Sequence, residues 1–301
     1  MKKIKRYSGK RIFSVIISLL IAVTAAVGYL WHFGGEALNF WKEANAPVSG
    51  VMEVHYIDVG QGDCTLIKCG NAAMLIDGGD NYTGTQVQLY LNKQGIKRLD
   101  YVIATHPDSD HIGGLDVIVY KYDCDTVIMP DIQKDSKSYR DLIAAMDSKY
   151  YKATLPQVGS EYALGEASFT VISPVREYED ANNFSVGILL KHGENTFLFT
   201  GDAESEAERD IATGSINIDC DVYKAGHHGS ASSSSEMLLN AANPAFAVIS
   251  CGSGNSYGHP HTSVLNELKY RGIKIFRTDI QGTIIATSDG ISIKWNCEPV
   301  E

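Results

Sequence analysis

The chain has 301 residues, 44% of them hydrophobic and 21% charged, and a formal net charge of −10. This composition predicts a globular chain with a large core, organised as one sizeable domain. Residues 1–46 hold seven Lys or Arg and two Glu, a net charge of +5, so the whole-chain value leaves −15 on residues 47–301. A domain this acidic repels polyanions, and no run of Lys or Arg with interleaved aromatic residues follows the first 46 residues. These features argue against a nucleic-acid-binding module.

The N-terminal region differs in composition from the rest. Residues 1–11 form a basic tail with six Lys or Arg, and residues 12–31 contain no charged residue. About twenty apolar residues suffice to cross a bilayer as a helix, so we expect a transmembrane anchor at 12–31. A cleaved secretory signal and a buried core helix are the alternatives. By the positive-inside rule an anchored chain has its C-terminal domain outside the cytoplasm, at the cell membrane, and a cleaved chain is secreted. Residues 32–50 are then a linker.

Six cysteines follow the linker: Cys64, Cys69, Cys124, Cys220, Cys251 and Cys297. None forms a Cys-x-x-Cys pair, which argues against a zinc ribbon. Outside the cytoplasm some of them can form disulfides, and buried free thiols are the alternative.

Short apolar runs alternate with helical patterns after residue 50. Mixed strands and helices within one domain predict layered α/β packing with the helices outside. Strands are expected near residues 54–59, 65–67, 72–76, 100–104, 126–129, 168–172, 186–191, 196–200, 221–224, 245–250, 274–276, 282–286 and 291–295, and helices near 86–92, 112–122, 139–149, 204–213, 236–242 and 262–271.

The strongest chemical signal is a six-residue stretch that begins at His106. It contains four potential metal ligands: His106, Asp108, Asp110 and His111. The stretch follows an apolar run and precedes Gly113-Gly114, which allows backbone to pack closely behind the loop. Four such side chains in one loop can converge on a metal ion.

Further polar clusters fall at the ends of apolar runs, where a layered sheet presents its loops. They include Asp58 to Asp63, Asp77-Gly78-Gly79, Thr200-Gly201-Asp202, His227-His228-Gly229-Ser230 and Gly258-His259-Pro260-His261. We expect Asp58 and Asp77 to orient ligand histidines from the ends of their strands, without binding metal themselves.

Five segments together resemble the metallo-β-lactamase superfamily: residues 57–63, 75–79, 105–114, 199–202 and 224–230. The resemblance is strongest to the C-terminal hydrolase domain of the ComEC/Rec2 competence proteins and to related phosphorylcholine esterases. It covers about residues 52–295 and implies an α/β fold, the four-layer αββα sandwich, for a hydrolase domain at 51–297. The metal site is then expected at one edge, where loops from both sheets meet.

The resemblance also implies a set of ligands. His106 and Asp108 bind a first metal ion in this reading, Asp110 and His111 bind a second, and Asp202 bridges both. His228 matches the later ligand of the second ion, with His227 and His259 as alternatives. His nitrogens and Asp oxygens suit zinc, at two ions per chain.

The sequence departs from the common family pattern in two ways. Asp108 replaces the middle histidine of the motif, and the histidine usual before the Asp202 strand is absent, with Asn182, Asn183 and Ser185 nearby. The oxygen-rich first site makes manganese an alternative to zinc, and a single-metal enzyme stays open. His192 is interpreted as a surface residue at the far end of its strand.

The resemblance implies metal-assisted hydrolysis. Asp110 holds the attacking water, or the water bridges both ions, and whichever of His227 and His259 is not a ligand gives a proton to the leaving group. A small-molecule or polymeric phosphoester or phosphodiester is the expected substrate; nucleic acid is disfavoured by the charge. An acyl or lactone hydrolase and a catalytically silent surface binding protein are the alternatives. The membrane is the expected partner, through the N-terminal helix, and no obligate protein partner is inferred.

Overall fold

Residues 50–300 are described by the structure, a computed structural model. The expected basic tail, anchor and nearly all of the linker lie outside these residues. Between residues 50 and 300 no helix combines the length and the apolar character needed to cross a membrane.

One mixed sheet contains eight strands of the described chain. They are β1 (Met52–Tyr56), β2 (Thr65–Cys69), β3 (Ala72–Ile76), β4 (Arg98–Ile103), β5 (Asp123–Ile128), β6 (Ala153–Thr154), β14 (Ile284–Ser288) and β15 (Ile293–Trp295). Their order across the sheet is β15-β14-β1-β2-β3-β4-β5-β6. Strands β3 to β6 run parallel to one another, whereas β15, β14, β1, β2 and β3 are joined by antiparallel pairs.

A second mixed sheet contains seven strands. They are β7 (Glu161–Leu164), β8 (Ala167–Ser173), β9 (Gly187–His192), β10 (Asn195–Phe199), β11 (Val222–Lys224), β12 (Phe246–Ile249) and β13 (Lys274–Arg277). Their order is β13-β12-β11-β10-β9-β8-β7, and β10 to β13 are parallel.

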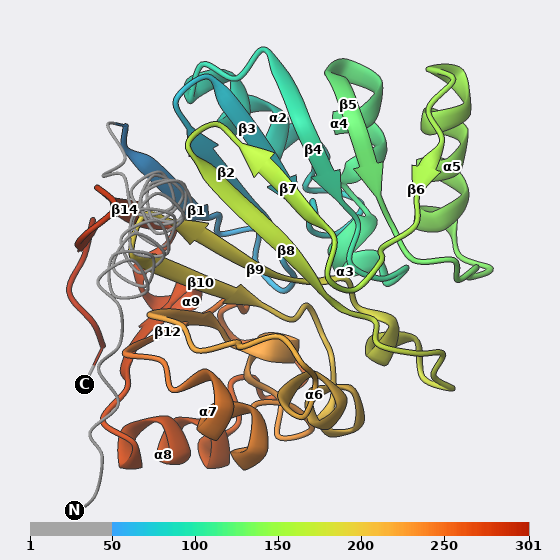
Figure 1. Cartoon of the computed structure of the whole chain (residues 1–301). Coiled ribbons are helices and arrows are strands. Elements are labelled where there is room, and N and C mark those ends of the chain that lie inside the picture. The colour runs from blue at the N-terminus through green and yellow to red at the C-terminus, as the bar shows by residue number, and fades with distance from the viewer. Residues whose placement is uncertain (1–49, 301) are drawn as a thin grey trace, which may run out of the picture. The chain divides into compact units, whose positions relative to one another are not determined.

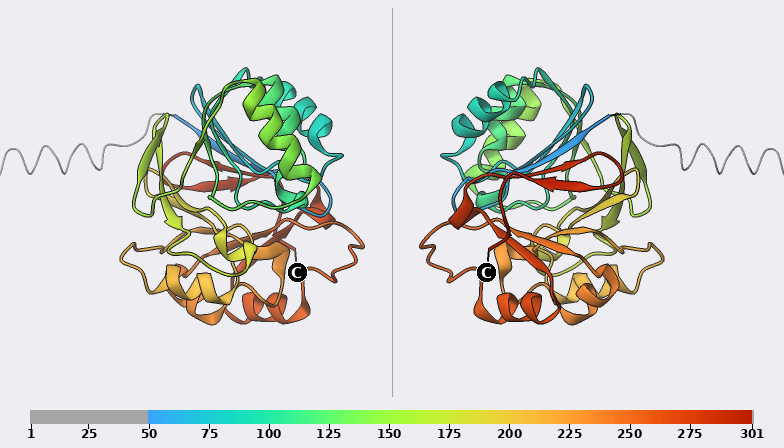
Figure 2. Two further views of the ribbon diagram at one scale, coloured as in Figure 1. Left: turned by 90° about the vertical axis from the view of Figure 1, so that its right-hand side faces the viewer. Right: turned by 90° about the vertical axis from the view of Figure 1, so that its left-hand side faces the viewer.

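Helices cover the outer face of each sheet, as Figure 1 and both views of Figure 2 show. Helices α2 (Gly84–Lys93), α4 (Leu115–Lys121) and α5 (Lys137–Ser148) share a hydrophobic core with the first sheet. Helices α6 (Ser205–Ala212), α7 (Glu236–Ala242) and α8 (Thr262–Tyr270) share another with the second sheet. Short helical turns complete the chain: α3 (Ser109–Ile112), η1 (Ala181–Phe184), η2 (Gly226–Gly229) and α9 (Thr278–Gln281).

The two sheets pack face to face through alternate side chains. On β8, Ala167, Phe169 and Val171 are buried while Ser168 between them is exposed, because successive residues of a strand point to opposite faces. Val54 from β1 and Phe197 from β10 enter the same core. The four layers therefore follow the order helices, sheet, sheet, helices, which confirms the expected αββα fold.

Several local expectations are corrected. Strands β6 and β7 were not expected, because β6 has two residues and β7 is a half-exposed edge strand. The interpretation of His192 as a surface residue is wrong: the ring is fully buried, and Nδ1 lies 2.8 Å from Ser288 Oγ of β14. The opposite sheet covers that end of β9. All six cysteines belong to the described region, where none forms a disulfide and all but Cys297 are buried.

The sheet topology places the polar clusters together. Asp77 follows β3, His106 follows β4, Asp202 follows β10, and His227 and His228 follow β11. These strands belong to the parallel parts of the two sheets, so their carboxyl ends lie at one edge, which is where open α/β sheets hold their ligands.

Candidate metal centre

The loop after β4 and the short helix α3 carry the central motif. His106 and His111 are almost completely buried, whereas Asp110 is partly exposed. The Gly-Gly pair that follows is sterically required: a Cβ on Gly114 would lie 2.3 Å from the carbonyl oxygen of Gly78. Close backbone packing behind the motif, expected from its sequence, is therefore observed.

Four imidazole rings face one carboxylate oxygen. From Oδ2 of Asp202, the Nε2 atoms of the rings lie at 3.2 Å (His111), 3.3 Å (His228), 3.6 Å (His227) and 4.0 Å (His106). Asp110 joins this group, because its Oδ2 lies 3.2 Å from His228 Nε2. Asp202 stands at the centre of this cluster.

Two buried atoms of the cluster lack hydrogen-bond partners within the described part of the chain: His106 Nε2 and Asp202 Oδ1. Leaving such atoms buried and unpaired is costly, so they indicate a missing ligand. A divalent cation coordinates both atom types. The residues present fit a metal ion.

Two expected site residues lie at the margin of the cluster. Asp108 pairs with Lys134, whose Nζ lies 2.5 Å from Oδ1, and its side chain is 31% exposed. The ring centroid of His259 lies 5.6 Å from that of His227 and 6.2 Å from that of His228. Its buried Nδ1 finds no partner between residues 50 and 300.

The turn after β11 aims the paired histidines. His227 and His228 both have left-handed backbones, with φ of 49° and 55°. Such conformations are unfavourable for non-glycine residues and persist where the surroundings enforce them, often at functional sites. Here the Ser230 N–H donates to the His227 carbonyl at 2.8 Å, and the His227 N–H donates to the Gly201 carbonyl at 3.2 Å. The turn buries His228 and leaves His227 23% exposed.

The side chain of Asp77 contacts two residues of the central motif from the side opposite Asp202. Its Oδ2 lies 2.8 Å from His111 Nδ1 and accepts the Thr105 hydroxyl at 2.7 Å. The expected orienting role of Asp77 agrees with this geometry. The side chain of Asp58, for which the same role was expected, accepts the Gly60 N–H at 3.1 Å within its own loop.

Asp63 is a site residue that sequence reasoning did not assign. Asp63, His111, Asp202 and His228 each offer a ligand atom, and these atoms lie within 4.8 Å of one another. However, Asp63 approaches Nδ1 of His228, at 3.2 Å, whereas Asp202 approaches Nε2. Asp63 also forms a buried ion pair with Lys224. Asp63 therefore lies behind the His228 ring, whose Nδ1 also lies 3.0 Å from the carbonyl oxygen of Ser250. A lysine within a buried strand was the signal available for this pair.

Electrostatics within the cluster favour added positive charge. Burial alone would raise the pKa of Asp202, but His111 and His228 lower it well below its usual value. Burial would lower the pKa of His111, yet Asp202 and Asp77 raise it. The carboxylates are stabilised by nearby positive charge. A divalent ion would supply that charge in place of protonated histidine rings. Burial lowers the pKa of His106 to about 4, which keeps this ring in the neutral form that binds metal.

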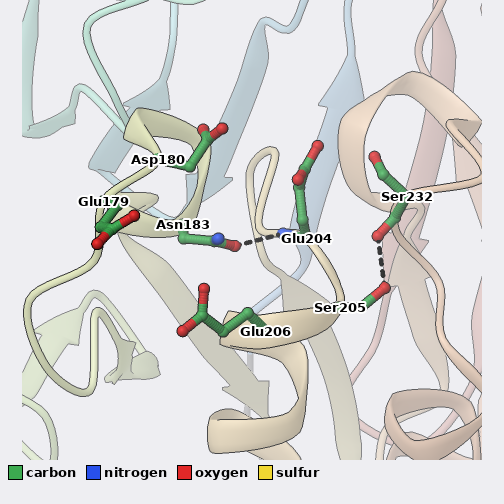
Figure 3. A pocket seen from close by; sticks show the side chains of 7 residues that line it. All are labelled: Glu179, Asp180, Asn183, Glu204, Ser205, Glu206 and Ser232. Carbon is green, nitrogen blue, oxygen red and sulfur yellow. Dashed lines mark hydrogen bonds between the residues drawn. The ribbon is translucent and has the colours of Figure 1, made fainter.

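An acidic pocket of about 450 Å³ lies beside the centre. Glu204 connects the two, because its Oε1 lies 3.4 Å from Nδ1 of His227. In Figure 3, Asn183 accepts the Glu204 N–H at 2.9 Å, and the Ser205 hydroxyl donates to the Ser232 carbonyl at 2.8 Å. The carboxylates that line the pocket belong to Glu179, Asp180, Glu204 and Glu206.

Relatives of known name match most of this domain. The chain is 32% identical over 252 residues to ComE operon protein 3 of Bacillus subtilis, covering 77% of this chain and 32% of the relative. It is 32% identical over 238 residues to recombination protein 2 of Haemophilus influenzae, covering 77% and 28%. The chain thus spans about a third of the length of these curated relatives, and it is similar to the ComEC/Rec2 competence proteins.

Solved structures share the fold at low identity. CmlA, a diiron β-hydroxylase from Streptomyces venezuelae, aligns with a TM-score of 0.51 at 15% identity, over 81% of this chain and 54% of that one. The metallo-β-lactamase fold protein YhfI from Bacillus subtilis aligns with a TM-score of 0.50 at 13% identity, over 75% and 95%. The family model of the metallo-β-lactamase superfamily matches residues 57–253. The chain therefore belongs to the metallo-β-lactamase superfamily.

Proposed function

We infer that the protein is a metal-dependent phosphodiesterase, anchored by residues 12–31 with its hydrolase domain outside the cytoplasm. The observation that carries the hydrolytic part is the cluster itself, in which four imidazoles face Asp202 and His106 Nε2 is buried with no partner in the described chain. The uncharged run at 12–31 supports the location.

The family pattern supplies the two ligand sets, and the cluster around Asp202 supports them for every residue except Asp108, which lies at its margin. His106, Asp108 and Asp202 would hold one ion, whereas Asp110, His111, His228 and Asp202 would hold the other. Zinc suits this mixture of nitrogen and carboxylate oxygen, and manganese is the alternative where oxygen prevails. When bound, the ions polarise the phosphoryl group and make water more acidic. Asp110, which is partly exposed at the mouth of the cluster, would orient the attacking water.

His227 is better placed than His259 to donate the proton. His227 is partly exposed, its Nε2 lies 3.6 Å from Asp202 Oδ2 in the cluster, and its Nδ1 lies 3.4 Å from Glu204 Oε1 at the edge of the pocket. Burial and the neighbouring His228 and His227 lower the pKa of His259 to about 4, so its ring is neutral near pH 7. His259 would instead contact the substrate or a metal ion through its free nitrogen.

The negative charge of the domain narrows the range of substrates that it is expected to accept. The pocket beside His227 is lined by carboxylates, and residues 47–301 carry −15. Both features disfavour a polyanion at this side of the centre. The names of the competence relatives make nucleic acid the main alternative to a small or weakly charged phosphodiester.

The test compares substrates on the full chain loaded with zinc or manganese. A chromogenic phosphodiester, plasmid DNA and a lactone panel are assayed for wild type and for Asp202→Asn. Turnover of the chromogenic diester that disappears in Asp202→Asn supports the proposal. Turnover of lactones alone, or diester turnover that survives in Asp202→Asn, contradicts it. A C-terminal alkaline phosphatase fusion, active only outside the cytoplasm, tests the location.

A further inference from the structure

A chain of hydrogen bonds runs from Asp77 through Thr105 to His106. Oδ1 of Asp77 accepts the Thr105 backbone N–H at 2.9 Å, and Oδ2 accepts the Thr105 hydroxyl at 2.7 Å. The same hydroxyl oxygen lies 3.1 Å from Nδ1 of His106. All three side chains are at most 1% exposed, so water does not compete for these bonds.

The direction of each bond follows from which groups can donate. An ionised carboxylate only accepts, so the hydroxyl proton of Thr105 is committed to Asp77. The hydroxyl oxygen can then only accept from His106, which places the ring proton on Nδ1. The lone pair of His106 is left on Nε2, the atom that points toward Asp202 and has no partner in the described chain.

His111 meets the same carboxylate directly. Its Nδ1 lies 2.8 Å from Oδ2 of Asp77, and its Nε2 lies 3.2 Å from Oδ2 of Asp202. Asp77 thus reaches one ring itself and the other through a threonine. A second oxygen, Oγ of Ser185, lies 3.4 Å from His106 Nδ1. This hydroxyl is farther from Nδ1 than the Thr105 hydroxyl is, and it accepts the Asp202 N–H at 3.0 Å.

We propose that Thr105 is a positioning residue that fixes the Nδ1-protonated tautomer of His106, so that Nε2 is free to bind the metal ion. The proposal rests on the metal site of the proposed function. It requires neither a particular substrate nor turnover. Partners of this kind typically contribute about 10–100-fold to metal affinity.

The first test removes the hydroxyl and then restores it. Thr105→Val keeps the shape of the side chain, while Asp77 retains its bonds to the Thr105 N–H and to His111. Thr105→Ser retains the hydroxyl and lacks the methyl group. Affinities for zinc and for manganese are measured on the full chain by competition with a chromophoric chelator. We expect Thr105→Val to lose roughly 10–100-fold in affinity for one ion and Thr105→Ser to stay within about threefold of wild type.

The second test reads the tautomer directly in the wild-type chain, and a variant serves only to assign the signals. Long-range ¹H–¹⁵N spectra of the metal-free wild-type chain report which ring nitrogen carries the proton, with His106→Gln used to assign the signals. A proton on Nδ1 of His106 supports the proposal, and a proton on Nε2 overturns it. Equal metal affinity in Thr105→Val and wild type overturns it too, as does an equal loss in Thr105→Ser. Because this spectrum needs neither metal nor substrate, failure of the proposed hydrolysis is a separate result.

Discussion

Lys224 and Asp63 form an ion pair directly behind His228, with side chains only 3% and 7% exposed. Removing one partner of a buried pair leaves an uncompensated charge, which costs about 3–5 kcal/mol. Lys224→Met should lower the free energy of unfolding of the metal-free chain by this amount in urea denaturation. Lys68→Met, which breaks the half-exposed pair with Glu53, is the control and should cost about 0–1 kcal/mol. Equal losses of free energy of unfolding in the two variants would contradict the idea that burial makes the Lys224–Asp63 pair more costly to break.

The second prediction concerns Gly62, whose backbone has a φ of +134°. A Cβ added to this residue would lie 2.3 Å from the carbonyl oxygen of Asp110. Gly62→Ala must displace α3, which bears Asp110 and His111, so we expect weaker zinc binding and a loss of about 1–3 kcal/mol in stability. Gly70→Ala is the matched control: φ is +60°, and no described atom lies within 4 Å of its added Cβ. It should cost about 1 kcal/mol and leave zinc affinity unchanged. Unchanged zinc affinity in Gly62→Ala would refute the idea that the backbone at Gly62 determines the position of Asp110 and His111.

A substitution of Lys134 tests whether Asp108 is a metal ligand. Both side chains are partly exposed, so their ion pair is worth about 0–1 kcal/mol. If a metal ion and Lys134 compete for Asp108, Lys134→Gln should raise zinc or manganese affinity by up to about fivefold. Lys149→Gln, which removes the partner of Asp123, should have no effect. An unchanged affinity in Lys134→Gln would indicate that Asp108 does not bind the ion.

His55 predicts a pH dependence of stability. Its ring is buried on β1 beside Tyr90, and burial lowers its pKa below the usual 6.5. The folded chain therefore favours the neutral ring, and this contribution is complete above about pH 6.5 and is lost as the pH falls toward the folded pKa. Compared with His55→Leu, the wild type should lose free energy of unfolding between pH 7 and pH 5. A difference that stays constant over this range would rule out the titration of His55.

The sequence was sufficient to predict the position of a site residue where its motif directly follows a strand. The candidate ligands of the central loop and Asp202 follow apolar strands directly, so the strand ends, together with the family resemblance, predicted that these residues meet at one sheet edge. The Asp63–Lys224 pair joins residues 161 positions apart, and no local pattern reveals which charges face each other across two sheets. The burial of His192 was missed for the same reason, since β14 covers it. The partner of Asp108, Lys134, comes from a loop before α5 whose path no periodicity specifies.

The division of the ligands between the two sheets has a consequence for folding. His106, Asp110 and His111 follow β4, whereas Asp202 and His228 follow β10 and β11. Neither half of the chain carries a complete site, so an ion binds tightly only after both sheets have assembled. Such binding adds about 1.4 kcal/mol to the stability of the native state for each tenfold excess of metal over its dissociation constant. A bound ion would thus link the two sheets, and the stability of the folded domain should rise with the concentration of metal around it.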